Sequence, residues 1–194
     1  MSLPEDVPGI TAAEDLFRYD IFGLPEELRE WSSDPSLFRL LVDGCVERET
    51  AFDLKSLRGD FEPLQVEAVL QCMTRVHWGR VRVRGARLWE VLKACGIQER
   101  AEKIALYGAE GFTTDLFLPE VSEKPGRFLL VYEMNGEPLT GVHGFPLRMA
   151  AIGKYAYKWC KWLNRISVPD YDFKGHYEGK RGWSDSAVRG ARVV

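Results

Sequence analysis

Short apolar runs, separated by turn residues, are the dominant pattern along this 194-residue chain. Runs typical of β-strands occur at positions 38–42, 64–72, 81–83, 103–107, 128–134, 147–152 and 159–168. Helical signals are short and occur near 25–31, at 53–57 with Asp53 as N-cap, and at 88–94 with Gly96 as the stop. The pair Asn135-Gly136 predicts a hairpin after the run at 128–134. Many short strands with few short helices predict a mixed, strand-rich α+β fold.

The composition is that of an ordinary globular protein, with 45% hydrophobic and 28% charged residues. At this length we expect a single domain over 1–194, in which 1–36 form an acidic, Pro-punctuated N-terminal arm. The net charge of -3 hides an asymmetry, because ten Lys or Arg residues face four Asp or Glu residues from His143 onward. This basic segment either binds an anion or is simply a solvated face. The acidic overall balance and the lack of a known motif argue against nucleic acid as a partner.

The four cysteines, at positions 45, 72, 95 and 160, are widely spaced and form no Cys-x-x-Cys motif. Cys45 and Cys95 are expected to be small core residues. No apolar run is long enough for a membrane span, so we expect none. The lack of an N-terminal signal segment predicts a cytoplasmic location, with the periplasm as the alternative if a native export signal is missing from this sequence.

The most informative segment lies between Val131 and Trp162. Four cationic side chains fall within fifteen residues there, at positions 148, 154, 158 and 161. Gly and Pro break this segment into turns, and a turning backbone that presents Arg and Lys suits a phosphorylated anionic ligand. Upstream, Cys72 follows an apolar run and offers a soft metal ligand. Together these features indicate a metal held through a phosphorylated organic cofactor.

The chain resembles the sulfite oxidase family of molybdopterin enzymes. The segments that carry the resemblance, in the family's order and spacing, are Leu70-Gln71-Cys72, Tyr132-Glu133-Met134-Asn135-Gly136, His143-Gly144-Phe145-Pro146-Leu147-Arg148 and Lys161-Trp162-Leu163. The likeness extends weakly from about Asp20 to Trp183. It implies the sulfite-oxidase-type molybdopterin-binding fold, reduced to the catalytic domain, because the chain has no room for the family's dimerisation or cytochrome domains.

The resemblance also implies a role for each matching residue. Cys72 would be the only protein ligand of molybdenum, although a lone cysteine on a strand is more often structural. His143 and Arg148 would contact the pterin. Alternatively, His143 could be hydrogen-bonded within a turn, and Arg148 could be a surface residue paired with a carboxylate. The other positions that would contact the cofactor are Tyr19, Asp20, Ile21, Gly108, Ala156, Tyr157, Lys158 and Lys161. Gly108 could equally be an ordinary turn residue.

Three departures from the family concern the substrate. Tyr19 and His77 stand where sulfite oxidases place arginines, and Phe112 stands where they place a tyrosine. The loss of fixed positive charge predicts poor binding of doubly charged sulfite, so an S-oxide or N-oxide is the expected substrate. His77 is the candidate catalytic residue of the pocket, as hydrogen-bond donor or proton carrier, or else an exposed loop residue.

The resulting hypothesis is a molybdopterin-dependent oxidoreductase that transfers an oxygen atom between a small substrate and a Cys-ligated molybdenum. Its cofactors would be molybdopterin and molybdenum, which supply the redox chemistry. Since the chain carries no haem motif, electrons would pass to or from a separate haem or flavin protein. The alternative is a non-catalytic carrier or storage protein for the molybdopterin cofactor. A third possibility is a purely structural domain that has lost its cofactor. The presence of Cys72 argues against it, because only metal ligation requires a sulfur at that position.

Overall fold

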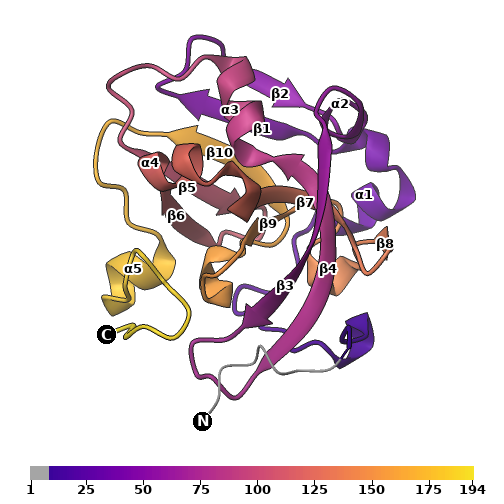
Figure 1. Cartoon of the computed structure of the whole chain (residues 1–194). Coiled ribbons are helices and arrows are strands. Elements are labelled where there is room, and N and C mark those ends of the chain that lie inside the picture. The colour runs from indigo at the N-terminus through magenta and orange to yellow at the C-terminus, as the bar shows by residue number, and fades with distance from the viewer. Residues whose placement is uncertain (1–8) are drawn as a thin grey trace.

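Two five-stranded sheets form the framework of the computed structural model, which describes residues 9–194 (Figure 1). Residues 1–8, the start of the expected arm, lie outside the described part. The first sheet has the order β2-β1-β10-β5-β6. Its strands are β1 (Leu40–Gly44), β2 (Thr50–Phe52), β5 (Lys103–Gly108), β6 (Thr113–Phe117) and β10 (Leu163–Val168). In this sheet the β1–β10 pair is parallel and the other pairs are antiparallel. Strands β1 and β10 are far apart in sequence but lie side by side, with β10 at the centre of the sheet.

The second sheet is fully antiparallel and is built on a long hairpin. Its strands are β3 (Pro63–Gln71), β4 (Trp78–Arg87), β7 (Phe128–Met134), β8 (Glu137–Pro138) and β9 (Arg148–Ala151), and β7 pairs with β4, β8 and β9. The strand expected at 81–83 is ten residues long, because Val81 and Val83 point inward while arginines alternate with them on the other face. Two of those arginines form ion pairs with acids on neighbouring strands: Arg82 with Glu67 at 3.0 Å and Arg84 with Glu133 at 3.2 Å.

The helices are short, with six to eight residues each. They are α1 (Leu28–Ser33), α2 (Leu54–Gly59), α3 (Leu88–Cys95), α4 (Leu118–Glu123) and α5 (His176–Arg181). The Asp53 carboxylate caps α2 by accepting a hydrogen bond from the Ser56 amide at 2.7 Å, as predicted. Gly96, with a φ of 74°, ends α3, also as predicted. Within residues 9–194, no helix is both long enough and apolar enough to cross a membrane.

The predicted hairpin after β7 is confirmed. Asn135 and Gly136 have φ values of 58° and 91°, which two-residue hairpin loops of this kind require. The expected strand at 159–168 is wrong in its first half, since β10 begins only at Leu163. Trp162 has a φ of 46°, which no strand residue adopts, and a 3-10 turn at Ala156–Lys158 precedes it. Strands β2 and β6 and helices α4 and α5 were not predicted.

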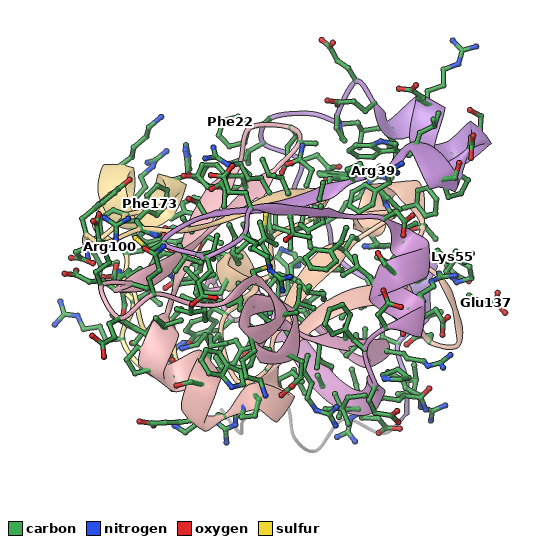
Figure 2. All side chains as sticks on the ribbon, turned by 90° about the horizontal axis from the view of Figure 1, so that it is seen from above. Phe22, Arg39, Lys55, Arg100, Glu137 and Phe173 are labelled. Carbon is green, nitrogen blue, oxygen red and sulfur yellow. The ribbon has the colours of Figure 1, made fainter. Side chains whose placement is uncertain are left out.

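The interior is filled by one main apolar cluster, to which both sheets and α3 contribute. Cys45 and Cys95 are buried in it, as expected. A smaller cluster joins the turn before β10 to the C-terminal residues, through Tyr155, Tyr157, Ala187 and Val193. Figure 2 shows the side chains crowding the interior, while the charged ends of Lys55, Arg100 and Glu137 lie at the periphery.

Candidate active site

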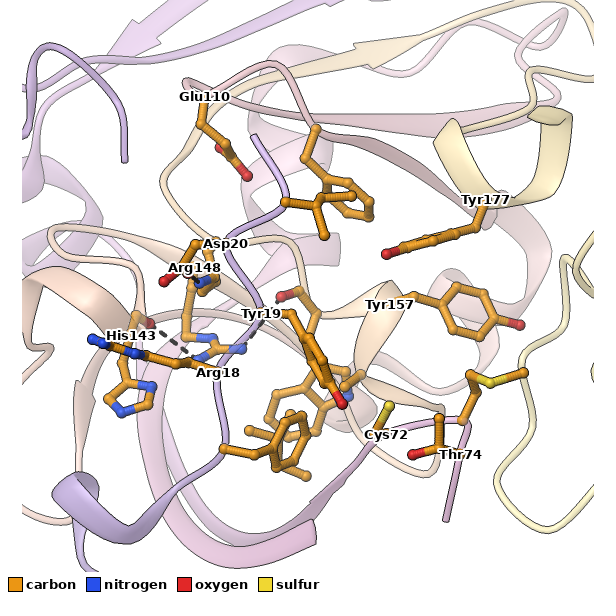
Figure 3. A pocket seen from close by; sticks show the side chains of 18 of the residues that line it. Arg18, Tyr19, Asp20, Cys72, Thr74, Glu110, His143, Arg148, Tyr157 and Tyr177 are labelled. Atoms are coloured by element: carbon orange, nitrogen blue, oxygen red, sulfur yellow. Dashed lines mark hydrogen bonds and ion pairs between the residues drawn. The ribbon is translucent and has the colours of Figure 1, made fainter. Parts of the chain in front are cut away.

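Five separate segments of the chain surround one cavity of about 290 Å³ (Figure 3). They are the arm at 17–21, the β3–β4 turn at 72–74, the β5–β6 turn at 110–112, the segment 143–161, and the C-terminal residues Tyr177 and Trp183. Most of the predicted site residues therefore lie together, although up to 142 positions separate them in sequence.

Cys72 is the first residue after β3, and its sulfur reaches the cavity. Its amide donates to the His77 carbonyl at 2.8 Å, and its own carbonyl accepts from the Arg75 amide at 3.0 Å, so the turn is closed around it. All four cysteines are free thiols, and Cys72 is the one that is not buried. Tyr19 places its hydroxyl beside the Cys72 sulfur (Figure 3). Desolvation and this sulfur together raise the pKa of the Tyr19 phenol.

Arg148 is a buried cation that forms no ion pair with an acid among residues 9–194. Its guanidinium donates to the carbonyls of His143 at 3.0 Å and Trp159 at 3.3 Å, while its Nε finds no acceptor among the described residues. Desolvation lowers the pKa of Arg148 to about 10, which still leaves it charged at neutral pH. His143 donates from Nε2 to the Ala13 carbonyl at 2.8 Å, and burial lowers its pKa, so the ring is neutral. A buried charge with an unused N–H suits an anionic ligand.

Lys161 fixes the N-terminal arm to the wall of the cavity. Its ammonium forms an ion pair with Asp20, donates to the Val142 carbonyl at 3.2 Å and lies 4.1 Å from the centre of the Trp162 ring. Burial lowers the pKa of Lys161, and the Asp20 carboxylate opposes that effect. Through this pair, Tyr19, Asp20 and Ile21 become part of the cavity lining, where the sequence had placed them.

Glu110 is a site residue that the sequence analysis missed. Its Oε2 atom is buried without a hydrogen-bond partner among residues 9–194, and desolvation raises its pKa to about 7. The carboxylate folds back onto Gly108, where a Cβ would lie 2.3 Å from Oε2 and 2.8 Å from the Lys161 carbonyl oxygen. Gly108 thus leaves space for the Glu110 carboxylate and the Lys161 backbone rather than lining the cavity itself. In the sequence, Glu110 is a single acidic residue in a turn, and no motif or pattern predicts its burial.

Lys158 does not line the cavity, and its ammonium is used elsewhere. It lies 2.9 Å from the Asp115 carboxylate and 2.5 Å from the Glu178 carboxylate, and all three side chains are fully buried. Lys103 adds a second cation 2.7 Å from Asp115. The predicted contact between this lysine and a cofactor phosphate therefore finds no support in the side-chain position, because two carboxylates already neutralise the ammonium. Its neighbours Ala156 and Tyr157 do line the cavity.

His77 lies at the rim rather than in the wall. Its ring is exposed and its centre is 6.0 Å from those of Phe17 and Tyr19. This position matches the alternative of an exposed loop residue, and its role as proton carrier stays a prediction. Tyr177 and Trp183 line the cavity instead, from a polar C-terminal stretch whose sequence carries no recognisable pattern.

Within residues 9–194, no group of three or more His, Cys, Asp or Glu side chains is arranged to hold a metal ion. A metal at Cys72 would therefore need further ligands from a bound cofactor. The remaining walls of the cavity fit such a ligand, since Arg148 offers a buried N–H and Glu110 a buried oxygen, both without partners among the described residues.

Comparison with known families decides what that cofactor is. The family model described as "Oxidoreductase molybdopterin binding domain" matches residues 28–177. The chain belongs to this family. The predictions of an oxidoreductase, of a molybdopterin cofactor and of molybdenum are thereby confirmed.

Several curated relatives are similar over most of this chain. Nitrate reductase (NADH) 1 of Phaseolus vulgaris is 33% identical over 169 residues, which cover 72% of this chain and 19% of the relative. The uncharacterized oxidoreductase YuiH of Bacillus subtilis (strain 168) is 32% identical over 151 residues, covering 75% of this chain and 72% of the relative. Mitochondrial sulfite oxidase of Drosophila melanogaster is 32% identical over 117 residues, covering 56% and 20%. The chain thus spans about a fifth of the nitrate reductase and the sulfite oxidase.

A solved structure supports the fold. The crystal structure of the sulfane dehydrogenase SoxCD from Paracoccus pantotrophus matches 93% of this chain and 48% of that chain, with a TM-score of 0.73 and 19% sequence identity. The predicted sulfite-oxidase-type α+β architecture is confirmed.

Arg148 provides a direct test of cofactor retention. We expect Arg148→Ala to lower the affinity for molybdopterin by about ten- to a hundredfold, because a charged hydrogen bond contributes roughly 1.5–3 kcal/mol. The measurement is the molybdenum and pterin content of the purified protein after dialysis. Lys93→Ala, which removes an exposed helix cation paired with Glu90 at 2.8 Å, is the control. Equal cofactor content in both variants would show that Arg148 serves another purpose.

Proposed function

We propose that this domain transfers an oxygen atom between a small oxide substrate and a molybdenum that is ligated by the Cys72 thiolate. The observation that carries the proposal is the position of Cys72, the one thiol of the four that is not buried, in the same cavity as Arg148, whose Nε has no acceptor among the described residues. A thiolate is a soft, anionic donor that suits a high-valent molybdenum. The bound cofactor supplies the two-electron redox change, and the protein binds, orients and shields it.

The chain's own residues divide the cavity into two ends. Arg18, His143 and Arg148 lie on one side of it, whereas Cys72, Thr74 and Tyr157 lie on the other (Figure 3). We assign the cationic end to the anionic cofactor, where Arg148 and Lys161 bind it through N–H donors. The thiol end is left for the substrate.

The thiol end favours a neutral substrate. Its lining beside Cys72 includes Met73, Thr74, Phe112 and Tyr177, and none of these side chains is charged. Arg75, in the same turn, points its guanidinium away, toward the Tyr155 hydroxyl at 3.1 Å and the Ala191 carbonyl at 3.2 Å. A dianion such as sulfite would lose its hydration there without gaining a cation. An S-oxide or N-oxide has no such cost.

The overall reaction in the reductive direction consumes R₂SO, two electrons and two protons, and yields R₂S and water. The electrons would come from a separate haem or flavin protein, and the protons from solvent at the open side of the cavity. A carrier function is less well supported, because the family and the relatives are described as oxidoreductases.

The substrate proposal is tested with molybdenum-loaded protein and reduced methyl viologen as electron donor. We expect turnover of dimethyl sulfoxide or trimethylamine N-oxide with a kcat/KM at least about tenfold above that of sulfite oxidation with ferricyanide, since one lost charged hydrogen bond already corresponds to that factor. Molybdenum content is measured on the same samples, so that an unloaded protein is not mistaken for an inactive one. Efficient sulfite oxidation would contradict the choice of substrate but not the family.

A further inference from the structure

Two phenols from different segments stand near the Cys72 thiol. Tyr19 comes from the N-terminal arm, and Tyr177 comes from the first turn of α5. Figure 3 shows the Tyr177 hydroxyl directed into the cavity, with Cys72 and Tyr19 across from it. Electrostatic interaction with Cys72 and with Tyr19 contributes to the raised pKa of Tyr177, after desolvation, which is the main cause. The three groups therefore face a common space.

The Tyr177 hydroxyl differs from those of the neighbouring tyrosines because nothing in the described part of the protein engages it. Tyr155 accepts hydrogen bonds at its hydroxyl from Arg75 at 3.1 Å and from the Gly190 amide at 3.1 Å. Tyr157 donates to the Ser184 carbonyl at 2.7 Å. No hydrogen bond of the Tyr177 hydroxyl occurs among residues 9–194. The Tyr177 hydroxyl is therefore available to donate a hydrogen bond to a ligand in the cavity.

The Tyr177 ring is held in place from several sides. It is stacked on Trp183 with ring centres 4.1 Å apart and planes 5° from parallel. The next residue, Glu178, accepts from the Thr114 hydroxyl at 2.8 Å and pairs with Lys158, which anchors α5 to strand β6. Gly175 allows that close approach, because a Cβ there would lie 2.3 Å from the Thr114 Cα. A donor whose position is fixed before binding acts with little reorganisation.

Phe112 lies against the same ring, at 5.8 Å between centres, and offers no hydroxyl of its own. Tyr19 is 50% exposed and has the Cys72 sulfur as its neighbour. Thr74 is also exposed, on the turn that carries Cys72. Tyr177 is therefore the fixed, unengaged neutral donor at the thiol end.

Resting on the proposed function, we infer that Tyr177 binds the substrate by donating a hydrogen bond from its hydroxyl to the oxygen atom of the neutral oxide. The role follows from four observations: the hydroxyl without a hydrogen-bond partner among residues 9–194, the stacked ring, the anchored helix and the uncharged lining residues Met73, Thr74 and Phe112 at the thiol end. It makes Tyr177 a determinant of specificity for oxides over thioethers and amines, which lack the accepting oxygen.

The test measures binding apart from turnover. Oxidised, molybdenum-loaded protein does not reduce dimethyl sulfoxide, so the sulfoxide can be titrated while the visible absorption of the metal centre reports its binding. We expect Tyr177→Phe to raise the Kd and the KM for the sulfoxide by about three- to tenfold, which corresponds to one neutral hydrogen bond. Molybdenum content and the spectrum without sulfoxide should equal those of the wild type.

The second variant restores the hydroxyl from the opposite ring. In Tyr177→Phe with Phe112→Tyr, a phenol is returned 5.8 Å away, and we expect at least part of the affinity to return. Tyr171→Phe is the matched control, since Tyr171 is 57% exposed and lies outside the cavity lining.

Each outcome has a distinct meaning. If the wild type reduces the oxides and Tyr177→Phe binds them equally well, the role of Tyr177 is overturned while the proposed function stands. Loss of molybdenum in Tyr177→Phe would also overturn it, because the residue would then hold the cofactor or the fold. If the wild type, fully loaded, neither binds nor reduces any oxide, the proposed function itself fails and the inference fails with it.

Discussion

Replacing Cys72 with serine should abolish turnover while the fold is retained. A serine hydroxyl is a harder donor than a thiolate and remains protonated at neutral pH, so it cannot supply the anionic sulfur that a high-valent molybdenum accepts. The substitution is small, and the backbone hydrogen bonds that close the turn at Cys72 do not involve the side chain. The measurements are kcat with an oxide substrate, molybdenum content and the visible absorption of the metal centre.

The matched control for that variant is Cys45→Ala. Cys45 is 4% exposed and belongs to the main apolar cluster, away from the cavity lining, so its loss should cost some stability and leave activity in place. Full turnover in Cys72→Ser would exclude sulfur ligation at this position. A wild-type protein that never takes up molybdenum when the cofactor is supplied would exclude it as well.

Replacing Lys158 with methionine should lower the free energy of unfolding by about 3–5 kcal/mol, because removal of one partner leaves buried carboxylates without a neutralising charge. Those carboxylates belong to Asp115 and Glu178, of which only Asp115 keeps a second cation, Lys103. For a protein of this size the melting temperature should fall by on the order of 10 °C. Urea denaturation of cofactor-free protein measures the effect without a contribution from ligand binding.

Lys93→Met serves as the control for Lys158, since its ion pair with Glu90 is exposed and such pairs contribute about 0–1 kcal/mol. The two explanations of Lys158 give opposite results. If the variant keeps its stability but loses cofactor, the phosphate contact predicted from the sequence is correct. If it loses stability in the absence of cofactor, the ion pairs with α5 and β6 are its main role.

Local patterns predicted most of the strands but not the surroundings of the charged residues. The strand β7, the hairpin at Asn135-Gly136 and the cap at Asp53 depend on neighbours in sequence, and each was found. The burial of Lys158 depends on Glu178, twenty positions later, and on Asp115, forty-three positions earlier. The periodicity of apolar residues along the chain cannot predict ion-pair partners at such separations.

The candidate site shows the same division. Motif order placed Cys72, Arg148 and Lys161 around one cavity, because a family motif already contains information about the fold. Glu110 and Tyr177 belong to no motif and became visible only from their positions in space. His77, whose spacing from Cys72 made it a candidate, lies at the exposed rim. The cytoplasmic location and the single-domain organisation remain predictions.

The walls of the cavity come from five segments, and the Lys161–Asp20 pair joins two of them across 141 positions. An unfolded or half-folded chain therefore has no place to bind molybdopterin, so the cofactor binds the native state alone. By mass action, a free cofactor concentration a hundred times its Kd would add about 2.7 kcal/mol to the stability of the protein. The amount of this protein that survives in a cell would then depend on the supply of molybdenum, with proteolysis removing chains that the cofactor has not reached.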